Sequence, residues 1–354
     1  MEGKLELPYT ATLMKRSVWL WVAVVLGLHP QITRAQINIE GSWESLLSKA
    51  RGLAEKGQLE DALELLIRTR QAAEKSGAAA ESIAITMNDL GTVYHALGRH
   101  SDAERTYASA IRLLNAHDLS TRPVMSRILD NQASLYMDFG GRFTDAERLR
   151  RCALELRISE VGPEGPGIAT LLSNLGSVCL ALGRFEEAEG LFRRALDLAE
   201  KTGTQGATTA GSVLQNLATL YGTMGRNTEA AHLIGRAVAS LEKVIGEDHP
   251  DLVRPLVNLA KVQIRLNRPL VAEVAVRRAQ RITETRLGPE HPLMLNILLT
   301  HENILRRTNR KAQAREANRR AAALLASNPD LRLASSTVDI SDLVKASRAR
   351  RSGH

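Results

Sequence analysis

The sequence predicts an all-α protein in which antiparallel helix pairs stack into one solenoid of about seven repeats. A glycine or asparagine followed by a polar residue returns at spacings of 41, 43, 42, 42, 42 and 42 residues, and small residues return in register with it. Hydrophobic residues make up 44% of the 354 residues, but aromatic residues make up only 3%. The helices must therefore pack through small side chains, and the chain has few rings on which bases or sugars could stack.

Residues 1–35 are expected to be a secretory signal peptide. Lys15 and Arg16 precede an apolar run of 11 residues at 18–28, and small residues stand one and three positions before a cut after Ala35. A bilayer-spanning helix needs about 20 apolar residues, so no stable membrane anchor is expected. The alternatives are a buried N-terminal helix or a short uncleaved anchor.

The signal peptide predicts that the mature protein is exported, to the periplasm or the medium. Met14 directly precedes the basic residues, so translation is expected to start there rather than at Met1, and the mature chain is expected to begin at Gln36. Four positive and two negative residues would leave with the signal, which lowers the formal net charge from +8 to +6.

Residues 42–326 carry the repeat, and each unit is predicted to be two amphipathic helices joined by a tight turn. The glycine or asparagine tolerates the left-handed conformation that ends a helix. Small residues 5 and 12 positions later would let the two helices cross closely. The turn residues are Gly57, Gly98, Gly141, Gly183, Gly225, Asn267 and Asn309; the small residues are Ala62, Ala103, Ala146, Ala188, Ala230, Ala272 and Ala314, then Thr69, Ala110, Ala153, Ala195, Ala237, Ala279 and Ala321.

One such unit cannot bury its apolar face alone, so neighbouring units are expected to share a continuous core. The terminal units would then act as caps. The last unit fits that role, because His301 and Glu302 stand where the fourth unit has Leu175 and Gly176.

The fourth unit reads Asn174-Leu175-Gly176, Gly183-Arg184-Phe185 and Glu187-Ala188-Glu189, followed by Phe192 and Ala195. In these residues, and in the connector at 287–292, the chain resembles tetratricopeptide-repeat proteins of the 42-residue variety found in kinesin light chains and many bacterial proteins. The resemblance covers roughly residues 42–326. It implies a right-handed superhelix whose first helices line a concave groove, with groove asparagines that bond the backbone of a bound peptide.

Nothing in the sequence supports an enzyme or a cofactor. No nucleophile elbow, phosphate-binding loop or dinucleotide fingerprint is present, and no metal site is expected. His249 and His291 each precede a proline, which favours capping of a helix start over metal binding. Cys179 stands in a slot where other units have tyrosine, so a small buried hydrophobe is favoured over a disulfide with Cys152.

A row of asparagines is the most informative polar pattern. Asn131, Asn174, Asn216 and Asn258 occupy one slot in consecutive first helices, and Gln215 precedes one of them. An amide donates and accepts at once, so the row could bond the backbone of an extended peptide in the groove. The alternative is that these amides bond within the solenoid and tie each first helix to its neighbour's carbonyls.

Basic residues gather on the same face toward the C-terminus. Arg254, Lys261 and Arg265 suggest a pocket for a carboxylate or an acidic segment. The alternative is a solvated basic face on a basic protein. Beyond the array, residues 327–354 are expected to form a mobile basic tail with a possible docking segment at 340–344.

The sequence therefore favours a non-enzymatic exported adaptor that binds a peptide or protein segment in its concave groove. The alternative is a structural scaffold that self-assembles through the solenoid ends, and a homo-oligomer is possible in either case. Nucleic acid is not an expected partner, because exposed rings are few and no basic stripe follows one helix. The partner itself cannot be named from the sequence.

Overall fold

The computed structural model describes residues 42–114, 118–138 and 141–327. The predicted signal peptide at 1–35 and almost all of the predicted tail at 327–354 lie outside the described residues.

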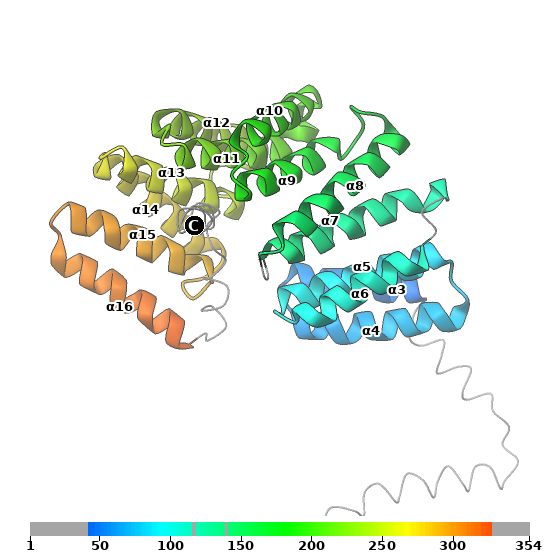
Figure 1. The fold of residues 1–354 in the computed structure, drawn as a ribbon. Coiled ribbons are helices and arrows are strands. Elements are labelled where there is room, and N and C mark those ends of the chain that lie inside the picture. The colour runs from blue at the N-terminus through cyan, green and yellow to red at the C-terminus, as the bar shows by residue number, and fades with distance from the viewer. Residues whose placement is uncertain (1–41, 115–117, 139–140, 328–354) are drawn as a thin grey trace, which may run out of the picture.

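The described residues form fourteen α-helices and three short 3₁₀ helices, with no β-strand among them, which confirms the predicted all-α class (Figure 1). The 3₁₀ helices are η1 (Leu119–Thr121), η2 (Gly203–Gly206) and η3 (Pro250–Leu252). The α-helices are α3 (Trp43–Glu55), α4 (Leu59–Ser76), α5 (Ala80–Ala96), α6 (His100–Leu113), α7 (Arg122–Asp138), α8 (Phe143–Val161), α9 (Ile168–Ala181), α10 (Phe185–Lys201), α11 (Ala207–Thr223), α12 (Asn227–Ile245), α13 (Val253–Arg265), α14 (Pro269–Arg286), α15 (Leu293–Arg307) and α16 (Lys311–Ser327).

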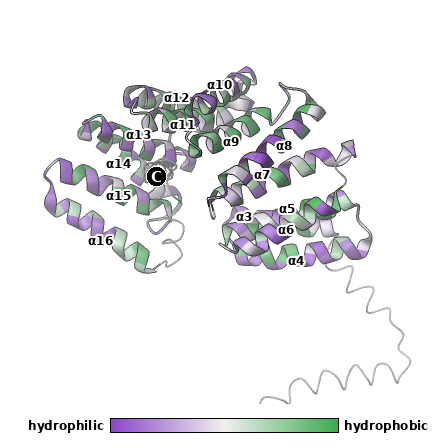
Figure 2. Ribbon diagram, in the orientation of Figure 1, coloured by the Kyte–Doolittle hydropathy of each residue, from purple (hydrophilic) through white to green (hydrophobic). Residues whose placement is uncertain are grey.

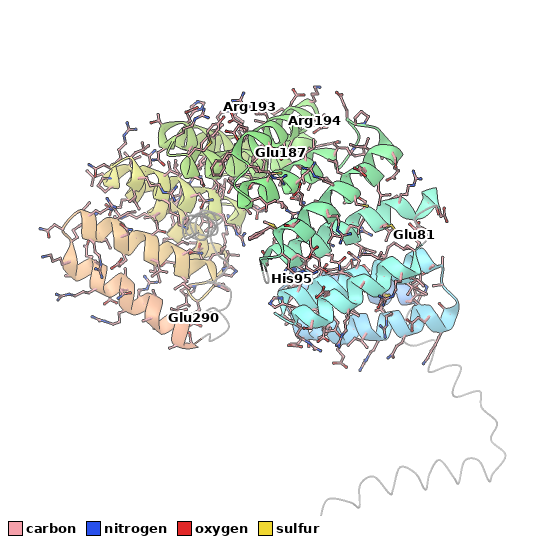
Figure 3. All side chains as sticks on the ribbon, viewed as in Figure 1. Glu81, His95, Glu187, Arg193, Arg194 and Glu290 are labelled. Atoms are coloured by element: carbon pink, nitrogen blue, oxygen red, sulfur yellow. The ribbon has the colours of Figure 1, made fainter. Side chains whose placement is uncertain are left out.

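The helices pack as seven consecutive pairs along an arc. Each pair has a first helix (odd numbers, α3 to α15) and a second helix (even numbers, α4 to α16), and each helix packs on the next. First helices of neighbouring units also touch: α5 contacts α7, and α13 contacts α15. In Figure 1, α9 and α11 lie on the inner side of α10 and α12. Arg193 and Arg194 of α10 lie at the outer edge of the arc (Figure 3).

The turns between the two helices of a unit have the predicted left-handed residue. Gly183 has a φ of 77°, and the two asparagines in this position, Asn267 and Asn309, have φ values of 56° and 60°. The residue after the turn donates its backbone N–H to the last turn of the first helix, as Arg184 does to the Cys179 carbonyl at 2.9 Å. This bond satisfies a helix-end carbonyl, so the turn closes without an unpaired group.

The small residues lie where the two helices of a unit cross. All fourteen are buried, and none exposes more than 3% of its surface. Each helix carries both hydrophobic and hydrophilic residues (Figure 2), and the hydrophobic ones form an extended core between units. Gly91 and Gly176 bring a first helix against the rings of Tyr107 and Phe192; a Cβ at Gly176 would lie 2.7 Å from the Phe192 Cε1 atom.

The histidines before proline cap helix starts, as predicted. The His249 Nδ1 atom accepts the backbone N–H of Asp251 at 3.2 Å. The His291 Nδ1 atom accepts that of Leu293 at the same distance. These contacts satisfy N–H groups that a helix start leaves without a partner.

In four units the arginine after the turn joins its unit to the one before it, a contact that the sequence pattern did not predict. It pairs there with a glutamate six residues beyond the previous turn residue. In the second unit Leu63 takes the glutamate position and Arg99 pairs with Asp102 of its own unit; in the sixth unit Ala231 takes it and Arg268 has no ion pair within the described helices. Arg142 and Arg226 also lie over the rings of tyrosines in their own units, and those tyrosines donate to the same glutamates. The pairs are Arg142–Glu104 (2.8 Å), Arg184–Glu147 (2.5 Å), Arg226–Glu189 (3.7 Å) and Arg310–Glu273.

None of the helices described by the structure combines the length and the apolar character that crossing a bilayer requires.

The contact between Gly176 and Phe192 gives a direct test of the packing. Gly176→Ala should lower the free energy of unfolding by about 1–3 kcal/mol relative to Gly190→Ala, because the added methyl group overpacks the buried ring only at position 176. Gly190, in α10, has no atom within 4 Å of its Cβ position. Both changes gain the same helix propensity, so urea unfolding of the two variants isolates the clash. Equal stability of the variants would contradict the packing described.

Candidate functional site

Four of the first helices, α9, α11, α13 and α15, carry mostly polar residues along one face, and of these residues only Ala181 and Thr300 are buried. Residues at spacings of four, three and four share a face of an α-helix. We call Arg254, Asn258, Lys261 and Arg265 the α13 stripe. The corresponding residues are Thr170, Asn174, Ser177 and Ala181 in α9, Ser212, Asn216, Thr219 and Thr223 in α11, and Asn296, Thr300, Asn303 and Arg307 in α15.

Three of the four row asparagines bond to the preceding first helix. Each donates its Nδ2 hydrogen to a side chain that stands one position before the asparagine slot of the previous unit. The bonds are Asn131 Nδ2 to Asn88 Oδ1 (2.8 Å), Asn174 Nδ2 to Asp130 Oδ2 (2.7 Å) and Asn216 Nδ2 to Ser173 Oγ (3.0 Å). These amides therefore tie neighbouring first helices together through side chains, and any contact with a partner stays a prediction.

Asn258 differs from the other three. The residue that would accept its hydrogen bond is Gln215, but the Gln215 Nε2 atom donates to the Gly211 carbonyl in its own helix at 3.4 Å. Within the described residues the Asn258 amide has no hydrogen bond, and its side chain is half-buried. The amide is therefore available to a ligand.

Hydroxyl groups on the middle stripes are used within their own helices. Ser212, Thr219 and Thr223 of α11 each donate to the carbonyl four residues earlier, at 2.9–3.1 Å. Ser177 of α9 does the same at 3.1 Å. Their donor hydrogens are thus already committed, so the stripes of α9 and α11 offer a ligand mainly weak acceptors.

The α13 stripe instead presents unpaired cations. Arg254 and Arg265 are exposed and Lys261 is half-buried, and none of the three has an ion pair or hydrogen bond in the part of the chain that the structure describes. Arg265 extends back toward α11, where its Nη1 atom lies 2.9 Å from the Cβ position of Gly222. Three cations and a free amide therefore follow one face of one helix, so the expectation that no basic stripe follows one helix is wrong for α13.

The surrounding first helices do not neutralise this charge. Helices α9 and α11 contain no charged residue, and α13 contains no acid. The one acid of α15, Glu302, pairs with Arg306. The face formed by these four helices therefore attracts anions, and little of its charge is offset nearby.

A buried ion pair in the third unit was not predicted from the sequence. Arg150 stands in the slot that holds Tyr107 and Phe192 in neighbouring units, and its Nε atom lies 3.3 Å from the Asp130 Oδ1 atom. Arg150 also donates to the Asn174 carbonyl at 2.6 Å and to the Ser134 hydroxyl at 3.0 Å. One side chain of α8 thus links α7 and α9.

Burial and attraction act against each other in this pair. Burial raises the pKa of the Asp130 carboxyl and lowers the pKa of the Arg150 guanidinium, while the attraction between the two groups opposes both shifts. The contact is intramolecular and closed to solvent, so we assign it to the structure and not to binding.

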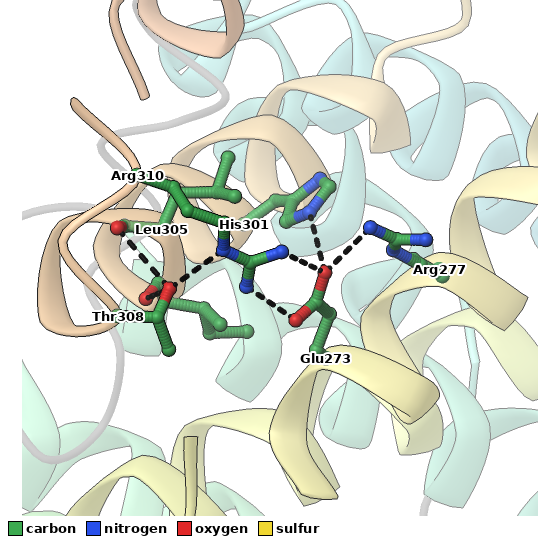
Figure 4. Close-up of polar contacts among 7 residues, drawn as sticks. Glu273, Arg277, His301, Leu305, Thr308 and Arg310 are labelled. Carbon is green, nitrogen blue, oxygen red and sulfur yellow. Dashed lines mark hydrogen bonds and ion pairs between the residues drawn. The ribbon is translucent and has the colours of Figure 1, made fainter. Parts of the chain in front are cut away.

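A second cluster holds the last two units together (Figure 4). Glu273 of α14 accepts from both Nη atoms of Arg310 and pairs with Arg277 at 2.6 Å, while the His301 Nε2 atom lies 3.9 Å away. Arg310 also donates to the Thr308 hydroxyl at 2.9 Å. The hydrogen bond from Arg310 lowers the pKa of Glu273, whereas burial lowers the pKa of His301.

The two cysteines are unpaired in the structure. Cys179 is fully buried, and burial raises the pKa of its thiol to about 11, as expected for a small core residue. Cys152 is exposed on α8. Across the described ranges, no group of three or more histidine, cysteine, aspartate or glutamate side chains is placed to hold a metal ion.

Comparison with protein families gives a match over most of the repeat array. A family model described as tetratricopeptide repeat matches residues 44–116, 124–201 and 209–285. No curated protein gives a significant match.

Solved structures share the fold. BtubC (BKLC) from P. vanneervenii is 24% identical with a TM-score of 0.51, over 70% of this chain and 94% of that chain. Kinesin-light-chain-like repeats from Podosopora anserina are 20% identical with a TM-score of 0.50, over 59% and 98%. A STAND protein with a tetratricopeptide-repeat sensor from Pyrococcus horikoshii is 14% identical with a TM-score of 0.60, over 86% and 45%.

The buried pair predicts a large effect of a single substitution. Arg150→Ile should lower the free energy of unfolding by about 3–5 kcal/mol, because it leaves the buried Asp130 carboxylate without its counter-ion. The double variant Arg150→Ile/Asp130→Gln copies Ile234 and Gln215 of the fifth unit and should recover most of the loss. Urea unfolding checks both variants. A single variant as stable as the parent, or a double variant no better than the single, would contradict this role.

The last two units should lose stability as pH falls. The folded pKa of His301 is below the unfolded value of about 6.5, so the unfolded chain binds the proton first, and stability decreases as pH drops through about 6.5 toward the folded pKa. His301→Leu should reduce the difference in unfolding midpoint between neutral and mildly acidic pH, and His232→Ala, on an exposed residue, should not. An unchanged pH dependence in His301→Leu would exclude this histidine as a cause.

Proposed function

The chain belongs to the tetratricopeptide-repeat family, whose members typically act as protein-binding adaptors, and on that premise we propose that it is an exported, non-enzymatic adaptor. Its ligand is an anionic segment of a partner protein, held on the concave face of the solenoid along the α13 stripe. The predicted signal peptide supports export.

The observation that carries this proposal is the unsatisfied binding capacity of α13. The asparagines of the third, fourth and fifth units are bonded to neighbouring first helices, whereas Asn258 is free and is flanked by three cations without partners. Charge-assisted hydrogen bonds are roughly twice as strong as neutral ones. Recognition is therefore concentrated at the sixth unit and not spread evenly along the asparagine row.

The dimensions of α13 suit a short segment. Its 13 residues span about 20 Å, and an extended chain advances about 3.3 Å per residue, so roughly six residues of a partner could lie along the stripe. The guanidinium group of an arginine can bind a carboxylate through two parallel hydrogen bonds, and the Asn258 amide can hydrogen-bond the partner's backbone. The cations then select acidic side chains and the amide holds the main chain.

Binding of an acidic probe tests the proposal. Arg254→Ala/Arg265→Ala in the full chain should weaken binding of a fluorescein-labelled peptide of alternating glutamate and alanine by about ten-fold or more, because each charged hydrogen bond contributes about 1.5–3 kcal/mol. Parental binding should also weaken steeply as salt rises. Fluorescence anisotropy gives both quantities.

The matched control is Arg194→Ala/Arg268→Ala. These two arginines are also exposed and without partners in the described helices, so the variant removes the same net charge from outside the stripe. The control should bind the probe almost as the parent does. If both double variants lose affinity equally, the probe senses only net charge and the stripe is not a site.

A further inference from the structure

We propose that the α13 stripe is covered in the free protein by a segment of the same chain, residues 338–344, which a partner must displace. This inference rests on the proposed function of the stripe and adds its regulation.

The sequence of this segment complements the stripe. It reads Val-Asp-Ile-Ser-Asp-Leu-Val and contains Asp339 and Asp342 but no basic residue, although the chain from Lys345 onward is basic. Two carboxylates facing three unpaired cations give electrostatic complementarity. The rest of the tail would instead be repelled by the stripe, which fixes the part of the tail that can dock.

The chain is long enough to reach. Helix α16 ends at Ser327 and runs antiparallel to α15, so its end lies beside the start of α15 and one unit from the start of α13. Twelve residues lead from Ser327 to Asp339, which span up to roughly 40 Å when extended. Neighbouring helices are about 8–10 Å apart and α13 is about 20 Å long, so the segment can reach the whole stripe.

Covalent attachment reduces the affinity that such a contact requires. A tethered segment acts at an effective concentration of about a millimolar, so even a weak contact is populated. A separate acidic segment must then compete with it, and apparent affinity falls by the fraction of stripes already covered.

A zero-length cross-link tests the contact directly. A carbodiimide joins an amine to a touching carboxylate, and Lys261 is the one lysine of the stripe. In the full chain we expect peptide mapping by mass spectrometry to find Lys261 linked to Asp339 or Asp342, with a yield that does not depend on protein concentration. Lys201, which lies 3.5 Å from Glu164, provides a positive control. The Lys201–Glu164 product without either Lys261 product would overturn the inference.

Binding of the acidic probe separates this inference from the proposed function. Asp339→Asn/Asp342→Asn in the full chain should tighten probe binding by about three- to ten-fold, since competition is removed, and Asp330→Asn should leave it unchanged. Equal probe affinity in parent and double variant, without the Lys261 cross-link, rejects tail docking but keeps the stripe as a site. A Lys261 cross-link with no probe binding in either protein supports the tail contact and rejects binding of acidic partners.

Discussion

The close crossing of two helices in every unit is the constraint on which the rest of the molecule depends. Fully buried alanines, such as Ala188 and Ala195 in the fourth unit, allow the helices to approach, and the left-handed turn at Gly183 returns the chain at the required angle. A larger side chain at a crossing would separate the pair and expose the core that neighbouring units share. Because these positions are fixed, variation between units is left to the outward faces of the helices.

The polar faces of the first helices differ along the array. In the third to fifth units, the asparagine of the first helix bonds to the previous first helix, so the polar face contributes to the stiffness of the solenoid. In the sixth unit, Gln215 bonds to its own helix and leaves Asn258 free among three cations. The same residue type at the same repeat position thus has two roles, and the difference arises from one neighbour on the preceding helix. Binding capacity and regulation by the tail would then both belong to the C-terminal part of the arc.

The fold could be predicted from the sequence almost completely, because its determinants recur within single units. Turn residues, crossing alanines and histidine caps act over a few positions, and the structure has them where the pattern indicated. The site could be predicted only in part, because the partners of the asparagines lie 43 or 44 residues away, in another unit. The buried role of Arg150 was not predicted from the sequence. Alignment of the repeats does contain a signal for it, because Arg150 occupies a position that is filled by Tyr107 and Phe192 in neighbouring units.

The central claim is that the sixth unit recognises an anionic partner segment, and photo-cross-linking in the native host tests it most directly. A photoreactive amino acid at Asn296, the exposed α15 residue that corresponds to Arg254, leaves the cations intact, and one at Arg194 probes the outer edge of the arc. The account predicts cross-linked partner peptides rich in aspartate or glutamate from position 296 alone, lost when Arg254 and Arg265 are replaced by alanine. Cross-links from position 296 that persist in that variant, or that capture peptides without acidic residues, would contradict it.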